Sequence, residues 1–243
     1  MPERSAPSGV RAFRPPLWAC LLTPLVMAVM VALGVWQLQR AAEKQQLQAD
    51  FRTAMAQTPQ ILAAPAPPAA MAPQHVIVEG RYLPQQQFLL DSQIREGQAG
   101  VRVWTALQRS TGGIILVDRG WTEDPGRQST KQWPVGTDLR QVQGLWRPLP
   151  AAGLQVANRL CEGAPAAAAP RVQYPTHAQL ACAFEDRLAD GLLLLHPQAA
   201  DGFERAWEPD YLRPEVHWGY AVQWFAFALA VFVIFVVVNW KKR

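Results

Sequence analysis

Apolar residues gather at the two ends of the chain, in two long runs without a formal charge. The first run covers residues 17–36 and the second covers residues 218–240. At a rise of about 1.5 Å per residue, helices of these lengths cross a hydrocarbon core about 30 Å thick. Tryptophans near both ends of the second run are typical of side chains at the level of the lipid headgroups. The pattern therefore predicts two transmembrane helices in contact with membrane lipid.

A cleavable signal peptide is the alternative interpretation of the first run. Three arginines precede it, and Ala32-Leu33-Gly34 has the small-x-small form of a cleavage site. The apolar run is longer than the core of a typical signal peptide, which spans about 7–15 residues. Cleavage would remove one anchor, but the second helix would hold the chain in the membrane in either case.

The pattern changes twice between the two apolar runs. Residues 37–57 are rich in helix formers and alternating charges, which predicts that the first helix continues as a polar stalk. Residues 58–73 contain five prolines and are a predicted linker in extended conformation. Residues 74–217 follow as the predicted folded core, in which the pattern favours mainly β structure.

Apolar and polar positions of this core alternate with a period of two, as in strands with one buried face. The expected strands lie at residues 76–82, 88–91, 101–108, 114–118, 141–146 and 191–195. Their short connections hold turn-forming glycines and leave no room for crossover helices, so the sheet should be mainly antiparallel. One helix is expected at residues 176–188, capped by Thr176. The predicted fold class is membrane α+β, with two transmembrane helices flanking a mainly antiparallel β-sheet in an extracytoplasmic domain.

The distribution of charge predicts the orientation. The two tails, residues 1–16 and 241–243, hold six of the 23 lysines and arginines but only one of the 19 acidic residues. The long segment between them therefore has a net charge of about −1. Short basic flanks stay in the cytoplasm, so we expect a multi-pass protein of a bacterial inner membrane with both termini cytoplasmic and the central domain periplasmic. Because the excess basicity lies in the tails, we expect no nucleic-acid partner.

The three cysteines differ in their surroundings. Cys20 lies within the first apolar run, whereas Cys161 and Cys182 lie in the predicted periplasmic domain. Thiols in an oxidising compartment tend to pair, which favours a disulfide between Cys161 and Cys182. Two unpaired, partly buried thiols are the alternative. The wide spacing does not indicate a copper site built from neighbouring thiolates.

Enzyme signatures are missing from the sequence, which has no Gly-x-Ser-x-Gly, no phosphate-binding loop and no His-Glu-x-x-His. We therefore expect a protein that is not an enzyme and assign no catalytic residue. Two alternatives remain open: a membrane-tethered hydrolase or oxidoreductase with an unrecognised site, and a periplasmic sensor. A sensor normally needs a cytoplasmic output domain, and the short tails leave no room for one.

Six short motifs follow one another along the chain. They are Leu33-Gly34-Val35-Trp36-Gln37-Leu38-Gln39-Arg40, Val78-Glu79-Gly80-Arg81-Tyr82, Leu89-Leu90-Asp91 with Gly100-Val101, Leu116-Val117-Asp118-Arg119-Gly120-Trp121, Gly144-Leu145-Trp146-Arg147-Pro148 and His217-Trp218-Gly219-Tyr220-Ala221-Val222-Gln223-Trp224-Phe225. In this order and between two apolar helices, they resemble the motifs of the Surfeit locus protein 1 family of cytochrome c oxidase assembly factors. Thr105-Ala106-Leu107 departs from the Thr-Pro-Leu usual in that family, and residues 161–182 have no counterpart that we can align.

The resemblance implies a non-enzymatic role in the assembly of cytochrome c oxidase, a heme-copper oxidase. The protein would help heme a enter subunit I, or stabilise that subunit while it is loaded. It implies a transiently bound heme a as cofactor, with subunit I and the proteins that make or deliver heme a as partners. A membrane-anchored chaperone that binds the subunit without binding heme is the alternative.

His217 is the candidate ligand for heme iron, the only metal that the resemblance implies. Histidine commonly holds heme iron, and His217 lies where the second helix begins. On a helix, His217, Tyr220, Ala221 and Trp224 share one face, which would offer a planar macrocycle two large rings and one small gap. An interfacial anchor belt of the same side chains is the alternative.

The remaining candidate residues lie in two motifs. Asp118 and Arg119 are interpreted as a structural ion pair, with Gly120 permitting a backbone turn and Trp121 covering the sheet. Recognition of a heme propionate or of a partner by Arg119 is the alternative, which makes Arg119 a candidate cofactor-binding residue. Partner binding or a structural anchor at the membrane surface is expected of Trp36, Gln37, Arg40 and Gln223.

Overall fold

The computed structural model describes residues 11–70, 72–124, 133–150, 169–185, 187–205 and 213–242. The chain divides into two compact units. The first unit consists of residues 1–47 and 211–243, and the second comprises residues 48–210.

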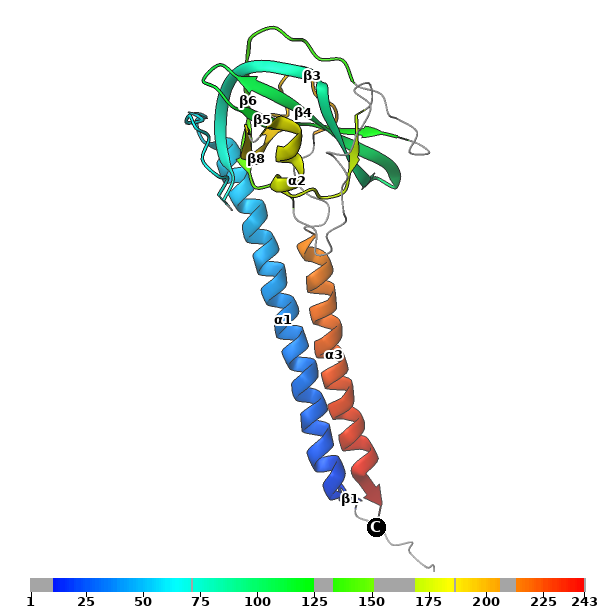
Figure 1. Ribbon diagram of the computed structural model, residues 1–243. Helices are drawn as coiled ribbons and strands as arrows, with labels where there is room; N and C mark the ends of the chain where they lie inside the picture. Colours follow the sequence, from blue (N-terminus) through cyan, green and yellow to red (C-terminus); the bar gives the residue numbers. More distant parts are fainter. Residues whose placement is uncertain are drawn as a thin grey trace, which may run out of the picture. The chain divides into compact units, whose positions relative to one another are not determined.

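Two long helices dominate the first unit (Figure 1). α1 (Leu17–Ala56) runs without a break from the first apolar stretch through the polar residues that follow, and its last turns belong to the second unit. α3 (Pro214–Asn239) contains the second apolar stretch. Both helices are long and apolar enough to cross a membrane, by length and composition. This arrangement fits a membrane-anchored protein.

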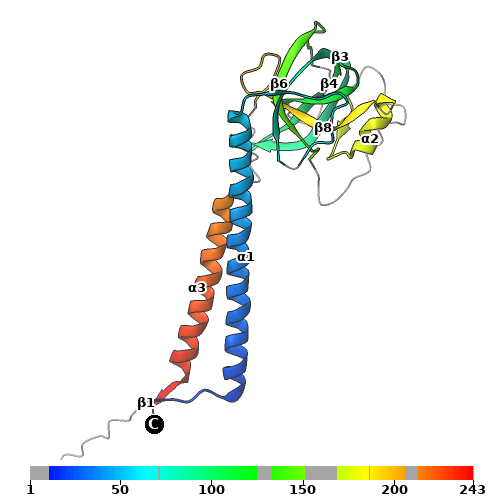
Figure 2. The same ribbon diagram turned by 90° about the vertical axis from the view of Figure 1, so that its left-hand side faces the viewer.

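α1 and α3 lie side by side in both views and pack closely at a glycine (Figure 2). A Cβ atom on Gly34 would lie 2.7 Å from the ring of Phe225, so a larger residue at this contact would require the ring to shift. Small residues allow membrane helices to approach each other in this way. β1 (Arg11–Phe13) pairs antiparallel with β9 (Trp240–Lys242), so the segments that flank the two helices also lie together.

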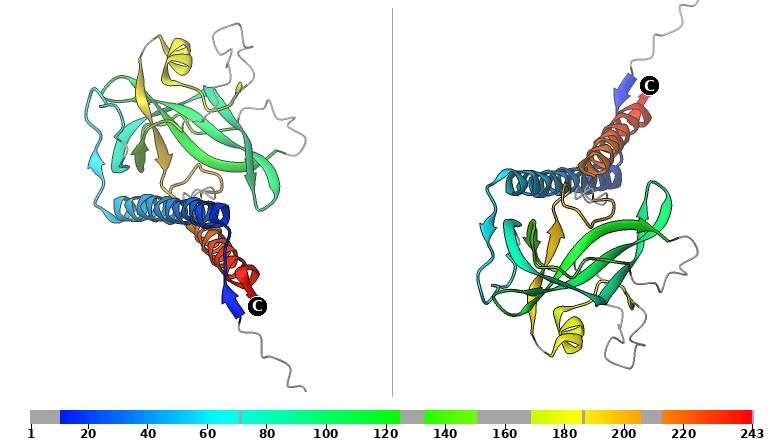
Figure 3. Two further views of the ribbon diagram at one scale, coloured as in Figure 1. Left: turned by 90° about the horizontal axis from the view of Figure 1, so that it is seen from below. Right: turned by 90° about the horizontal axis from the view of Figure 1, so that it is seen from above.

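The second unit is built around a closed β-barrel (Figure 3). Its strands are β2 (Gln60–Ile61), β3 (Gln74–Arg95), β4 (Gln98–Arg109), β5 (Ile114–Glu123), β6 (Arg140–Arg147), β7 (Arg171–Val172) and β8 (Leu188–Leu195). The order β3-β4-β5-β8-β6 is closed by a further pairing of β6 with β3. Trp104, Trp146 and Phe184 are the largest of the fully buried side chains. Closure leaves these central strands without a free edge.

The prediction of a mainly antiparallel sheet is wrong, because the sheet is mixed. β5 and β8 run parallel, as do the short strands β2 and β7 where each pairs with β3. Parallel neighbours need a long crossover connection, and residues 124–187 provide one between β5 and β8. α2 (His177–Ala181) lies in this connection beside β8, so the expectation that no crossover helix has room is also wrong (Figure 2).

The predicted cap of α2 is confirmed, but the predicted end of the helix is wrong. The Thr176 hydroxyl accepts from the backbone N–H of Gln179, and the Gln179 side chain accepts from the backbone N–H of Thr176. A single 3-10 turn follows and ends at Glu185, whose φ of 51° is left-handed. Leu188 is buried as the first residue of β8.

β3 is one long bent strand where the sequence pattern predicts two. Val76, Val78 and Tyr82 are buried while Glu79 and Arg81 are exposed, as the alternation predicts. The pairing with β4 shifts register at two points along β3, and such irregularities bend a strand. The bend allows the first half of β3 to pair with β6 while the strand also pairs with β4, which closes the barrel.

The proline-rich segment lies along the barrel and forms no helix among its described residues. β2 adds to β3, and the buried Arg109 donates to the carbonyls of Leu62 and Ala63 at 2.9 and 2.7 Å. The backbone N–H of Ala69 donates to the carbonyl of Asp190. Proline-rich chain has few backbone donors, so side chains of the barrel supply part of its hydrogen bonds.

Candidate functional site

His217 in the first turn of α3 is hydrogen-bonded to α1. Its Nδ1 lies 2.7 Å from Oε1 of Gln37. A side-chain amide oxygen is only an acceptor, so Nδ1–H donates, which in the neutral form of the ring places the lone pair on Nε2. Among the residues that the structure describes, Nε2 has no hydrogen-bond partner. Metal-binding histidines commonly have this arrangement, in which the second ring nitrogen donates to an oxygen.

The other residues of the predicted helix face differ in exposure, so they do not all line one open surface. Ala221 is 1% exposed and lies toward the helix contact, so the gap expected there is covered. Tyr220 is 49% exposed, and Trp224 is partly buried with its ring edge-on to Phe227. Close packing at Gly34 determines which face of α3 turns inward. A planar group that binds at His217 therefore has the side of Tyr220 open to it.

The structure joins two predicted residues that the sequence placed in separate motifs. Gln37 was expected to bind a partner or to anchor the helix, which stays a prediction, and in the structure its side chain contacts His217. Nearby, Trp36 is 54% exposed, and Arg40 forms an ion pair with Glu43 one turn further along α1. Gln223 is exposed on α3. No sequence signal links Gln37 to His217, because the contact depends on how the two helices pack.

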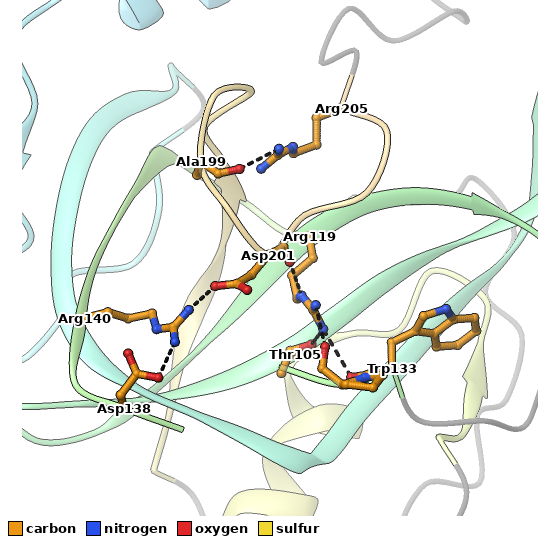
Figure 4. Close-up of polar contacts among 9 residues, drawn as sticks. Thr105, Arg119, Trp133, Asp138, Arg140, Ala199, Asp201 and Arg205 are labelled. Atoms are coloured by element: carbon orange, nitrogen blue, oxygen red, sulfur yellow. Dashed lines mark hydrogen bonds and ion pairs between the residues drawn. The ribbon is translucent and has the colours of Figure 1, made fainter. Parts of the chain in front are cut away.

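Arg119 occupies a buried position in the barrel, with 3% of its surface exposed (Figure 4). Its Nε donates to the carbonyl of Asp201 at 2.7 Å, and its Nη2 donates to the carbonyl of Pro134 at 3.1 Å. Longer contacts of 3.4 and 3.5 Å join Nη1 to the carbonyl of Trp133 and to the Thr105 hydroxyl. The guanidinium therefore connects β4 to two loops of the barrel. These contacts favour the structural interpretation of Arg119.

The surroundings of Arg119 contain ionisable side chains of both kinds, basic and acidic. Burial lowers the pKa of Arg119, and the neighbouring Arg140 and Arg205 act in the same direction, while Tyr82 and Asp201 oppose them. Burial also raises the pKa of Tyr82 to about 12, so its hydroxyl stays neutral. Carbonyl oxygens and the face of the Phe203 ring, 5.0 Å from the guanidinium carbon, therefore stabilise much of the charge of Arg119.

Asp118 and Arg119 are both described by the structure, and they do not form the predicted ion pair. The carboxylate of Asp118 lies 2.8 Å from Nε of Arg102, and it also accepts from the indole N–H of Trp104 and the backbone N–H of Gly120. Neighbouring side chains on a strand point to opposite faces, so adjacent residues rarely meet. The sequence missed Arg102 as the partner, because it lies on the adjacent strand.

Gly120 and Trp121 form the backbone site to which residues 201–205 attach. Gly120 has a φ of +113°, and a Cβ there would lie 2.7 Å from the carbonyl oxygen of Glu204. Trp121 and Glu204 exchange backbone hydrogen bonds of 2.8 and 3.0 Å, and Phe203 donates to the carbonyl of Arg119. Only glycine adopts this conformation without strain and leaves room for the neighbouring chain.

The described cysteines are in different states. Cys20 is a free, exposed thiol, and Cys182 is disulfide-bonded. Cys161, the partner predicted from the sequence, lies outside the described residues. Pairing of Cys161 with Cys182 therefore stays a prediction.

Thiol labelling of the denatured, unreduced chain checks this pairing. We expect one cysteine to be labelled, and three after reduction. In a Cys20→Ser control, no cysteine should be labelled before reduction. On the chain-entropy estimate the disulfide stabilises the fold by roughly 3 kcal/mol. Labelling of all three cysteines without a reductant would exclude the pair.

Comparison with known proteins identifies the family. A model of the SURF1 family matches residues 25–229, a range that includes all six sequence motifs and both Gln37 and His217. A search of curated proteins finds no match to the chain. The SURF1 family is generally linked to the assembly of cytochrome c oxidase, as an assembly factor rather than a catalyst. Because the match covers most of its length, this chain belongs to the SURF1 family, the family that its motifs resemble.

Proposed function

We propose that this protein assists the insertion of heme a into subunit I of cytochrome c oxidase and holds the heme transiently through His217. The hydrogen bond between His217 and Gln37 carries the proposal, since it leaves Nε2 of a neutral imidazole available to iron. When bound, the heme supplies an iron that accepts a nitrogen ligand. Tyr220, half exposed beside His217, and Trp224 one turn further offer apolar rings to the macrocycle.

The experiment is purification of the full chain in detergent from cells that make heme a, followed by an absorption spectrum. We expect the bands of a histidine-ligated heme a that co-purifies with the protein. A matched preparation from cells that lack heme a synthesis should show no such bands. A colourless protein from the first cells would contradict direct heme binding.

We further propose that the protein lies in a bacterial inner membrane with both termini in the cytoplasm and the barrel in the periplasm. The excess of basic residues in the two tails supports this orientation. The pairing of β1 with β9 also supports it, because adjacent strands at the ends of α1 and α3 must share one side of the membrane.

Reporter fusions test the orientation. Fusions at the N-terminus and after Arg243 should both report the cytoplasm, and a fusion near Gly126 should report the periplasm. A cytoplasmic signal from the middle fusion would overturn the charge argument.

A second candidate function is that of a chaperone that binds the oxidase subunit without heme. The observation that favours it is an exposed stripe on α3, made of Val216, Gly219, Tyr220 and Gln223. A Cβ on Gly219 would have no neighbour within 4 Å, so the backbone is open to close approach there. Helices of a membrane partner pack well on such surfaces. Subunit I and the proteins that make or deliver heme a are the partners that either function implies.

A further inference from the structure

We propose that Gln37 is a positioning residue for His217, a role that rests on the proposed heme binding. The amide oxygen of Gln37 accepts the Nδ1 proton and so determines both the tautomer of the imidazole and the orientation of its plane. Gln37 itself touches no ligand. Its effect on the heme passes through the histidine.

The geometry of the helix pair makes this contact specific. Gly34 lies one turn before Gln37 on α1, and the absence of a side chain there lets the ring of Phe225 pack against α1. The Nδ1–Oε1 distance of 2.7 Å is that of a strong hydrogen bond. Both side chains are partly shielded from solvent, so the bond is stronger than the same contact in water. A helix pair with this packing holds the ring of His217 in place before any ligand arrives.

The chemistry of the acceptor predicts how ligation depends on residue 37. An oxygen that accepts from Nδ1–H raises the electron density on Nε2 and strengthens its bond to iron. Without the acceptor, the proton can occupy either nitrogen, and only one of the two tautomers leaves Nε2 free. Loss of such a partner commonly lowers metal affinity by about 10–100-fold. A carboxylate in the same place is a stronger acceptor than an amide.

Three variants of the full chain separate these effects. Gln37→Leu removes the acceptor at similar volume, and Gln37→Glu keeps an acceptor and increases its strength. Gln39→Leu is the matched control, because Gln39 is an exposed glutamine on the same helix. Each protein is purified in detergent from cells that make heme a. Bound heme is measured per chain, so that a change in protein abundance does not imitate a change in affinity.

The spectroscopic readout is the iron–histidine stretching frequency of the ferrous protein, measured by resonance Raman scattering. We expect Gln37→Leu to retain about 10–100-fold less heme after gel filtration, with a lower stretching frequency in the remainder. Gln37→Glu should retain heme and raise the frequency above that of the wild type. Gln39→Leu should match the wild type in both.

The outcomes distinguish this inference from the proposed function. A wild-type protein that binds heme, with a Gln37→Leu variant unchanged in heme content and in frequency, overturns the positioning role alone. Loss of heme in Gln37→Leu that Gln37→Glu does not restore also overturns it, because an acceptor at position 37 would then not be sufficient to hold the heme. A wild-type protein without heme overturns the proposed function and, with it, this inference.

Discussion

Replacing His217 with alanine should remove the heme that co-purifies with the protein. The change deletes the imidazole that Gln37 holds, and no other described residue of α3 offers a nitrogen ligand at that position. Alanine is the best helix former, so α3 should still form and insert. The protein should accumulate at wild-type level, and host cells should assemble less active oxidase. Heme per chain and oxidase activity are the measurements.

A rescue experiment makes the His217 test sharper. His217→Gly leaves a cavity of about the size of an imidazole, so free imidazole in the buffer should restore part of the bound heme if the side chain acts as ligand. His177→Ala is the control, since the Nε2–H of His177 donates to the carbonyl of Leu188 and the residue lies in the other unit. A His217→Ala protein with wild-type levels of bound heme would eliminate the ligand assignment. The chaperone without heme would then be the better account.

Replacing Arg119 with alanine should lower the stability of the barrel by roughly 3 kcal/mol or more. The loss leaves the carbonyls of Asp201 and Pro134 without their hydrogen bonds in part-buried positions, and an acceptor that loses its partner away from water costs about 1–3 kcal/mol. The side chain also leaves a cavity beside Phe203. Protein abundance in membranes and the thermal unfolding midpoint in detergent are the measurements, and both should fall.

Two further arginine variants show whether a loss of stability in Arg119→Ala comes from the hydrogen bonds of its guanidinium. Arg119→Lys should be intermediate, because one ammonium cannot reproduce the planar fork that reaches both carbonyls. Arg81→Ala is the matched control, since Arg81 is exposed on β3 and makes one long contact of 3.3 Å, so its loss should change the midpoint little. Normal abundance and midpoint in Arg119→Ala, together with reduced oxidase activity, would instead support contact with a propionate or a partner.

Local pattern was sufficient for several elements of this protein. Uncharged runs of helix-spanning length identified the apolar parts of α1 and α3, because length and composition are enough to recognise such helices. Alternation identified the first half of β3, since a strand with one buried face has period two. The cap at Thr176 was also predictable from the sequence, because capping depends on residues only three positions apart.

The candidate site could be predicted only in part. The motifs identified His217 and Arg119 as residues of interest, and a family model supports the same family. The partners of both residues were not predictable. Gln37 reaches His217 across 180 positions of sequence, and Arg119 binds backbone carbonyls, which every residue possesses and no residue type signals.

Tertiary structure alone decided the remaining features. Periodicity indicates which face of a strand is buried, but not which strand lies beside it. The parallel pairing of β5 with β8 and the closure of β3 on β6 could therefore not be predicted from the sequence. Likewise, the apolar pattern of a helix does not predict how that helix is rotated about its axis against a partner helix. That rotation, set by the contact of Gly34 with Phe225, turns Ala221 inward and brings Gln37 to His217. Sequence by itself determined the two apolar helices and the alternating strands, because each depends on neighbours along the chain, whereas partners distant in sequence were decided by packing.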